Sequence, residues 1–153
     1  MTVYFYDTTI GKIGIAENNG KITNVFFKKD DIPKNAQISE TPLLKEAADQ
    51  LAKYLAGELK AFDLPLDAAG TPFMKQVWQC LTEIPYGETS SYRDIAEKID
   101  NEKAYRAVGL ANNKNPIPIF IPCHRVIGTD GALTGYRGGL AVKKMLLELE
   151  KAK

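Results

Sequence analysis

The sequence predicts an α+β protein, in which a small antiparallel meander and one helix precede a mostly helical region. Three short runs rich in β-branched and aromatic residues come first, at residues 3–6, 13–15 and 22–27. They are separated by Gly11 and by the pair Asn19 and Gly20, which suits a two-residue hairpin turn. We therefore expect three antiparallel strands at the start of the chain.

A helix completes this first lobe. Thr41 followed by proline is typical of an N-cap with proline at the first helical position, and apolar residues recur at helical spacing up to Gly57. Residues 58–70 contain proline and glycine and show little periodicity, which predicts a linker. The expected domains are therefore an N-terminal α/β lobe at residues 1–57, this linker, and a second domain at residues 71–153.

The second domain begins with the same cap-and-proline signal at Thr71. Apolar side chains then line one face of a helix, namely Phe73, Val77, Trp78 and Leu81. Ser91 can cap a helix over residues 92–99, and Asn101 can cap another over residues 102–112, so a turn of about three residues would join them. That spacing resembles a helix-turn-helix.

Two further segments complete the second domain. The apolar run at residues 117–121 is too short and too close to prolines for a helix, and we expect it to be extended. Gly138 and Gly139 precede a last helix. Its apolar face would consist of Val142, Met145, Leu146 and Leu149, which are spaced by three and four residues.

The composition excludes several classes of protein. With 44% hydrophobic and 25% charged residues, the chain resembles neither a disordered protein nor a fibrous repeat. The longest apolar stretch, residues 116–122, is far too short to cross a bilayer, and the first residues lack the features of a secretory signal. Two cysteines cannot form a disulfide framework. We expect a cytoplasmic protein with no membrane partner.

The charge is balanced overall but uneven along the chain. The net charge of +1 argues against a protein that binds polyanions over its whole surface. Residues 1–100 carry 11 basic and 15 acidic side chains, whereas residues 101–153 carry 9 basic and 4 acidic ones. This asymmetry indicates a local contact with phosphate, with chance unevenness in a small protein as the alternative.

The only histidine, His124, directly follows one of the two cysteines, Cys123. A free thiol is only slightly ionised at neutral pH, so a base or a positive field within reach is what makes it a nucleophile. Consecutive side chains of a regular strand or helix do not meet, so this pair needs an irregular backbone or a bridging water. A third residue must orient the imidazole, and Glu148 and Glu150 are both candidates.

The other cysteine, Cys80, lies within the first helix of the second domain, beside Trp78 and Leu81, and we expect it to be structural. Two cysteines and one histidine do not match any zinc spacing, so the sequence predicts no metal site. Neither a P-loop nor a dinucleotide-binding glycine motif is present.

The segment NPIPIFIPCHRVIGTDGALTGYRGGLAVKKMLLELE resembles the active-site signature of the methylated-DNA-protein-cysteine methyltransferases, or alkylguanine-DNA alkyltransferases. The upstream segments GTPFMKQVWQCLTEIPYGETSSYRDIA and KAYRAVGLANN resemble the preceding blocks of that family in the same order. The resemblance covers about residues 70–150. It implies an RNase H-like first lobe and a winged-helix-like DNA-binding domain.

The resemblance also implies a reaction and its catalytic residues. Members of the family move an alkyl group from the exocyclic oxygen of guanine in duplex DNA to their own cysteine, once per molecule and without a cofactor. Cys123 matches the acceptor, His124 matches the residue that deprotonates it through a water, and Glu150 matches the carboxylate that orients the histidine. Asn115 matches the asparagine hinge before the active-site segment. Tyr92 matches the tyrosine that contacts the 3′ phosphate and donates to the base.

Further positions match the residues that bind DNA and the extruded base. Arg106 matches the arginine that enters through the minor groove and fills the gap left by the flipped base. The small residues Ala107, Gly109 and Ala111 would allow close approach to the groove. Pro118, Tyr136 and the backbone around Arg137 match the wall of the base pocket.

The sequence departs from the family pattern at a few positions. Leu110 stands where many members have a smaller residue. Arg137 replaces a serine of some members, so a side-chain hydrogen bond from this position to the substrate is not expected. The cysteines and histidines that hold zinc in the N-terminal lobe of certain relatives are absent here. We expect no metal.

The sequence leaves three other functions as alternatives. An alkyltransferase-like protein would recognise alkylated DNA without repairing it, but such proteins replace the cysteine that this chain retains. A cysteine hydrolase would turn over a small acyl substrate, and a DNA-bending module would perform no chemistry. As its partner we expect duplex DNA containing alkylated guanine. We expect a monomer without an obligate protein partner, with cooperative binding along DNA left open.

Overall fold

The computed structural model describes residues 1–151 and divides the chain into two compact units, Met1–Ala68 and Ala69–Lys153. An N-terminal mixed sheet with a helix and a C-terminal helical domain confirm the α+β prediction. No helix within residues 1–151 combines the length and the hydropathy that a membrane span requires.

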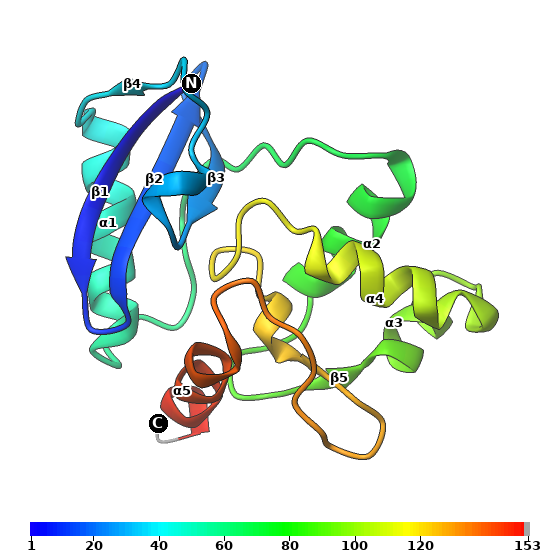
Figure 1. Ribbon diagram of the computed structural model, residues 1–153. Coiled ribbons are helices and arrows are strands. Elements are labelled where there is room, and N and C mark those ends of the chain that lie inside the picture. The colour runs from blue at the N-terminus through cyan, green and yellow to red at the C-terminus, as the bar shows by residue number, and fades with distance from the viewer. Residues whose placement is uncertain (152–153) are drawn as a thin grey trace. The chain divides into compact units, whose positions relative to one another are not determined.

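The first unit is a four-stranded sheet covered by one helix (Figure 1). Its strands are β1 (Thr2–Thr8), β2 (Gly11–Asn18), β3 (Lys21–Phe26) and β4 (Gln37–Ile38), in the order β3-β2-β1-β4. The three expected strands pair antiparallel, and β4 adds a short parallel strand beside β1 that the sequence did not predict. A 3-10 turn, η1 (Lys29–Asp31), lies between β3 and β4.

Local sequence explains how this unit folds. Asn19 and Gly20 join β2 to β3 with φ angles of 53° and 77°, the left-handed region that asparagine and glycine tolerate best. The helix α1 (Pro42–Leu55) begins as expected, because the Thr41 hydroxyl accepts a hydrogen bond from the Leu44 amide. One face of α1 is buried, at Leu44, Ala47, Leu51 and Tyr54. These side chains pack in an apolar core with sheet residues such as Val3, Ile13 and Ile15.

Part of the expected linker belongs to the first unit. The amide of Ile22 donates to the Pro65 carbonyl and the amide of Asp67 donates to the Ile22 carbonyl, both at 2.8 Å. Leu66 forms a parallel bridge with Ile22. Residues 65–67 therefore run beside β3, because their backbone groups extend its ladder even though their side chains show no strand periodicity.

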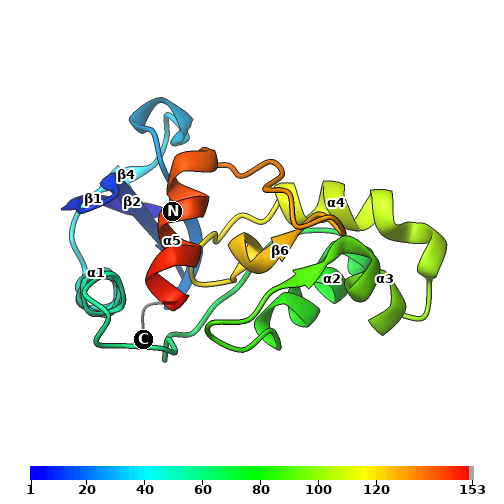
Figure 2. The same ribbon diagram turned by 90° about the horizontal axis from the view of Figure 1, so that it is seen from below.

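The second unit is built on three packed helices and a two-stranded parallel ribbon (Figure 2). The helices are α2 (Pro72–Thr82), α3 (Tyr92–Lys98) and α4 (Tyr105–Asn113). The ribbon pairs β5 (Ser90–Ser91) with β6 (Val126–Ile127), and α5 (Leu140–Lys151) ends the described chain. The buried Trp78 of α2 donates its indole N–H to the Ala111 carbonyl of α4 at 2.8 Å, which ties two of the helices together.

The helix-turn-helix prediction holds with one correction. Ser91 caps α3 in a capping box with Asp94, as its position predicts. Asn101 does not cap the second helix through its side chain. That helix starts as a 3-10 turn, η2 (Glu102–Ala104), which follows Asp100 in the left-handed region at φ 58°. The backbone thus makes the turn where we expected a side-chain cap.

The predicted extended segment at residues 117–121 is wrong. Ile119 has a φ of 76° and the amide of Ile121 donates to the Ile117 carbonyl at 2.9 Å, so this segment is a tight buried loop. Ile117, Ile119 and Ile121 are all buried. Their hydrophobicity reflects burial of the loop rather than a strand, a distinction that a short apolar run does not reveal.

Candidate active site

Cys123 lies where the buried loop turns into a single 3-10 turn, η3 (Cys123–Arg125). Pro122 has φ −80° and ψ 64°, and the Cys123 amide donates to the Ile121 carbonyl at 2.8 Å. These values describe an inverse γ-turn. The backbone around the cysteine is thus irregular, which is what two consecutive functional side chains require.

His124 is held by a carboxylate from the far end of the unit. Its Nε2 lies 2.7 Å from Oε2 of Glu150, and both side chains are almost completely inaccessible, at 0% and 1%. Glu150 belongs to the last turns of α5. The alternative carboxylate, Glu148, is exposed and lies 3.9 Å from Lys144 on the surface of the same helix.

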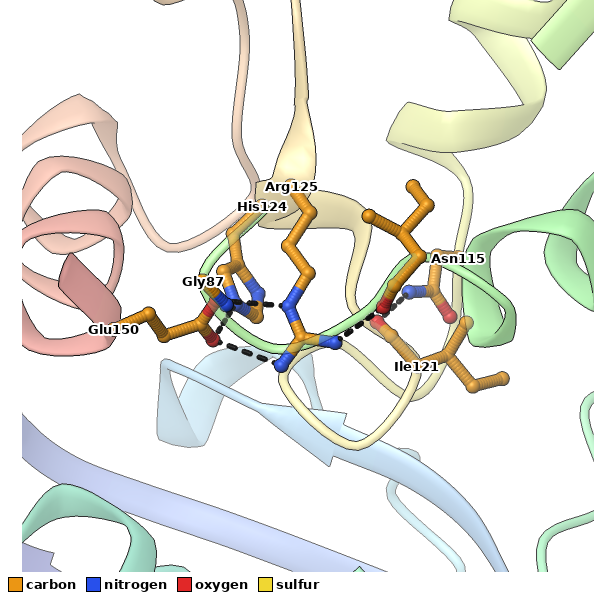
Figure 3. Close-up of polar contacts among 7 residues, drawn as sticks. Gly87, Asn115, Ile121, His124, Arg125 and Glu150 are labelled. Atoms are coloured by element: carbon orange, nitrogen blue, oxygen red, sulfur yellow. Dashed lines mark hydrogen bonds and ion pairs between the residues drawn. The ribbon is translucent and has the colours of Figure 1, made fainter. Parts of the chain in front are cut away.

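Arg125 completes this cluster, and sequence reasoning did not assign it a role. Its guanidinium donates to both oxygens of Glu150, from Nε at 2.8 Å and from the NH2 group at 3.0 Å (Figure 3). Its NH1 group donates to the Ile84 carbonyl at 2.8 Å. Such a bidentate pair fixes the plane of the carboxylate. Because Arg125 directly follows His124 in the sequence, its position was the signal that could have identified it.

Asn115 organises the loop that carries the cysteine. Its side-chain amide donates to the Ile121 carbonyl at 2.9 Å and accepts from the Ile117 amide at 3.0 Å. A second buried asparagine, Asn112, donates to the Cys123 carbonyl at 3.4 Å. Asn112 is buried at the end of α4, so its side chain supports the loop from that helix.

Lys143 is the other residue that the sequence did not single out. It is fully buried, and its ammonium donates to the carbonyls of Val126 at 2.7 Å and Thr134 at 2.8 Å. The buried face of α5 consists of Lys143, Leu146 and Glu150, whereas Met145 of the expected apolar face is exposed. The spacing of three and four residues was present in the sequence, but a lysine is seldom counted as a core residue.

The electrostatics of the site favour a neutral thiol beside a neutral imidazole. Burial raises the pKa of Cys123 to about 11, against the hydrogen bond of Asn115 and the positive charge of Lys143. Burial also lowers the pKa of His124, against its hydrogen bond to Glu150. The resting cysteine is therefore protonated near neutral pH. A thiolate must form through transfer of its proton to a base, and not through the resting field of the protein.

The residues expected to bind DNA are only partly brought to one surface. Arg106 and Ala107 are exposed on α4, and the Arg106 guanidinium lies 6.0 Å from the Tyr105 ring centre. Arg93 of α3 lies over the same ring at 5.0 Å. Ala111 was expected on this surface, but it is only 2% exposed because α4 turns it towards the interior. Its side chain therefore does not belong to the exposed surface of α4.

Tyr92 and the expected pocket residues lie on separate segments of the unit. Tyr92 starts α3, and its hydroxyl forms a hydrogen bond with Thr134. A Cβ at Gly109 would lie 3.7 Å from the Tyr92 ring, so α4 packs beside this tyrosine. Pro118 is buried in the loop before Cys123. Tyr136 is half-buried, and the exposed Arg137 reaches the Asn113 carbonyl at 3.5 Å.

Comparisons with known proteins agree over both units. The ribonuclease-like domain of 6-O-methylguanine DNA methyltransferase matches residues 1–68, and the DNA-binding domain of the same enzyme matches residues 72–152. The constitutive methylated-DNA–protein-cysteine methyltransferase of Bacillus subtilis is 49% identical over 152 residues, which cover 95% of this chain and 92% of that protein. The corresponding protein of Methanosarcina barkeri is 50% identical, with coverage of 96% and 97%.

Solved structures lead to the same family. The structure of Mycobacterium tuberculosis OGT in complex with DNA matches with a TM-score of 0.93 and 46% identity, covering 99% of this chain and 94% of that one. The structure of O6-methylguanine methyltransferase from the same organism matches with a TM-score of 0.92. The chain therefore belongs to the methylated-DNA–protein-cysteine methyltransferase family.

Proposed function

We propose that this protein repairs DNA by direct reversal, moving the alkyl group of an O6-alkylguanine in duplex DNA onto Sγ of Cys123. The observation that carries the proposal is the buried cluster in which Glu150 holds His124 next to this cysteine. Nε2 of His124 is committed to Glu150, so Nδ1 is the ring nitrogen that takes the thiol proton. A bridging water would carry that proton, since the two side chains are adjacent in sequence.

The transfer balances without any cofactor. The thiolate forms a bond from sulfur to the alkyl carbon, and the bond from that carbon to O6 breaks with its electron pair on the purine. A hydroxyl such as that of Tyr92 donates to the purine and offsets the developing charge. The proton taken from Cys123 leaves His124 for solvent, and the purine anion takes up one proton in return, through Tyr92 or a bound water, so that the products are neutral guanine and an S-alkylcysteine. The product is a thioether that hydrolysis does not reverse, so each protein molecule reacts once.

The DNA would meet the surface of α4. Arg106, which is exposed on α4, would enter the minor groove and occupy the gap left by the flipped nucleotide, and the small residues Ala107 and Gly109 would allow a close approach. Pro118, Tyr136 and the backbone at Arg137 would line the pocket for the extruded base. We propose that the protein is a monomer in the cytoplasm and is associated with the nucleoid when it is bound to DNA.

The repair function is tested by counting transferred methyl groups. With excess duplex containing O6-methylguanine, the labelled methyl bound to protein should rise to one per molecule and then stop. The Cys123→Ser variant should accept none. Continued turnover of an activated ester by the same site would instead favour the hydrolase, and tight binding of methylated duplex without transfer would favour a recognition protein.

The role of Arg106 is tested by comparing two substrates. Arg106→Ala should slow transfer from methylated duplex about tenfold or more, since a few kcal/mol of unstacking are no longer offset. Transfer from the free base, O6-methylguanine, should stay within about twofold, because no duplex has to be opened. The matched control is Lys75→Ala, which removes an exposed cation from α2. Equal slowing on both substrates would contradict the assignment.

A further inference from the structure

Thr134 occupies a special place in the loop that joins β6 to α5. This loop runs alongside the start of α3 (Figure 2), and its first half is closed on itself by a hydrogen bond from the Gly128 amide to the Ala132 carbonyl at 2.9 Å. Thr134 follows this closed turn and is half-buried. It is the point at which the loop contacts Tyr92.

Both the side chain and the backbone of Thr134 form hydrogen bonds. Its side-chain hydroxyl forms a hydrogen bond with the hydroxyl of Tyr92. Its carbonyl accepts a hydrogen bond of 2.8 Å from the buried ammonium of Lys143, which also binds the Val126 carbonyl in β6. The backbone of Thr134 is therefore anchored from α5 while its side chain reaches α3, so the direction of the hydroxyl is restricted.

The direction of the hydrogen bond between two hydroxyls has a chemical consequence. Each hydroxyl has one proton to donate and can also accept. If Tyr92 donates to Thr134, it has no proton left to direct at a substrate. If Thr134 donates to Tyr92, the tyrosine O–H remains available, and its oxygen is stabilised as that proton shifts towards an acceptor.

We propose that Thr134 is a positioning residue for Tyr92, donating its hydroxyl proton into a hydrogen bond with the tyrosine oxygen so that the tyrosine O–H is directed at the extruded guanine. This inference rests on the proposed function. Thr134 does not give up its proton and does not contact the reacting atoms. It orients the Tyr92 hydroxyl, which contacts the extruded guanine. It also stabilises the negative charge that develops on Tyr92 during transfer.

The alternative role for Thr134 is purely structural, as a fixed point that keeps the loop folded. A double-mutant cycle separates the two roles. A residue that acts through the Tyr92 hydroxyl loses its effect once that hydroxyl is removed, whereas a residue that only holds the loop affects the rate whether or not the hydroxyl is present.

The experiment measures single-turnover methyl transfer from a duplex containing one O6-methylguanine. Thr134→Val should lower the rate about tenfold, the effect of one hydrogen bond to a group that gains charge. Thr134→Ser should stay within about twofold of the unmodified protein, because the donor is retained. Thr134→Ala serves as a second deletion, should valine disturb the loop. Thr129→Val removes an exposed threonine hydroxyl from the same loop as the matched control.

The decisive arm uses Tyr92→Phe as the background. We expect Thr134→Val to change the rate of that variant by less than about twofold. An equal loss in both backgrounds, or an unchanged rate for both Thr134→Val and Thr134→Ala in the presence of Tyr92, would overturn the inference. Failure of the unmodified protein to accept any methyl would overturn the proposed function itself, so the two failures are distinguishable.

Discussion

The two units of this chain bury different kinds of side chain. In Met1–Ala68 the fully buried residues are apolar or aromatic, such as Val3, Leu51 and Tyr54. Within the described residues, every buried polar or charged residue belongs to the second unit: Asn112, Asn115, His124, Arg125, Lys143 and Glu150. Both units have hydrophobic cores, but among the described residues only the second unit buries acidic, basic or amide side chains.

This difference indicates where function imposes a cost on folding. An apolar side chain gains free energy on burial without needing a particular partner. A buried charge is tolerated only with partners of fixed geometry, so Glu150 requires Arg125 and His124 together. The polar cluster is therefore the part of the molecule in which geometry and chemistry depend on each other, and substitutions in the two units should differ in kind.

The largest effect is expected for Glu150→Gln. This change keeps the size of the side chain but removes the charge that supports His124, so the rate of methyl transfer should fall by about 10² to 10⁴. The rate is measured per folded molecule in single-turnover assays. Glu148→Gln, on the exposed face of the same helix, is the matched control and should react normally. Similar rates for the two variants would show that Glu150 does not support the base.

Arg125→Met should chiefly affect stability. It leaves the buried Glu150 without its bidentate partner, which should lower the free energy of unfolding by about 3–5 kcal/mol. In the first unit, Lys12→Met removes a cation 3.7 Å from Asp7, where both side chains are exposed, and should cost about 1 kcal/mol or less. Urea titrations of the two variants measure both values. Similar losses of unfolding free energy in the two variants would contradict the claim that buried ion pairs distinguish the second unit from the first.

Leu51→Ala tests the apolar core of the first unit. Truncation of this fully buried leucine of α1 should lower the free energy of unfolding by about 3 kcal/mol, because apolar burial is lost and a cavity remains. The rate of methyl transfer per folded molecule should be unchanged within about twofold, because no buried polar partner is lost. A large rate loss in fully folded protein would mean that this core also determines the chemistry of the site.

The smallest effect concerns pH. Burial depresses the pKa of His124 below its usual 6.5, so the histidine stays neutral and able to accept a proton as the pH falls through that value. The transfer rate at pH 6.5 should therefore remain above half of its value at pH 7.5 and decline only in more acidic solution. The same depressed pKa favours the folded state above pH 6.5, and that stability is lost as the pH falls towards the folded-state pKa. A half-maximal rate above pH 6.5 would contradict this prediction.

Much of the fold could be predicted from the sequence. The caps at Thr41, Thr71 and Ser91 and the turn at Asn19 are local signals, and local physics decides them. The parallel strand β4 and the strand-like path of residues 65–67 could not be predicted. Backbone hydrogen bonds define both segments, and their side chains show no strand pattern. The buried loop before Cys123 was mistaken for an extended segment because a short apolar run reveals burial but not the backbone conformation.

The site was less accessible to prediction. Cys123 and His124 are neighbours in sequence, but Glu150 reaches them only through the fold, and spacing alone left Glu148 equally acceptable. Arg125 and Lys143 were missed because charged residues are expected at the surface. The protonated state of Cys123 was also not foreseen, since it depends on complete burial of the sulfur.

The two cysteines of the second unit provide the most direct test of the account. Cys80 lies in α2 at 9% exposure, and burial raises its pKa, with Glu83 adding to the effect. Cys123 is more deeply buried, at 4% exposure, and lies next to His124, Lys143 and Asn115. After reaction with duplex containing O6-methylguanine, peptide mass analysis should find one methyl group on the peptide with Cys123 and none on the peptide with Cys80. A methyl on Cys80, or an unmodified Cys123 in folded protein, would contradict the claim that the buried polar cluster makes this one sulfur the acceptor.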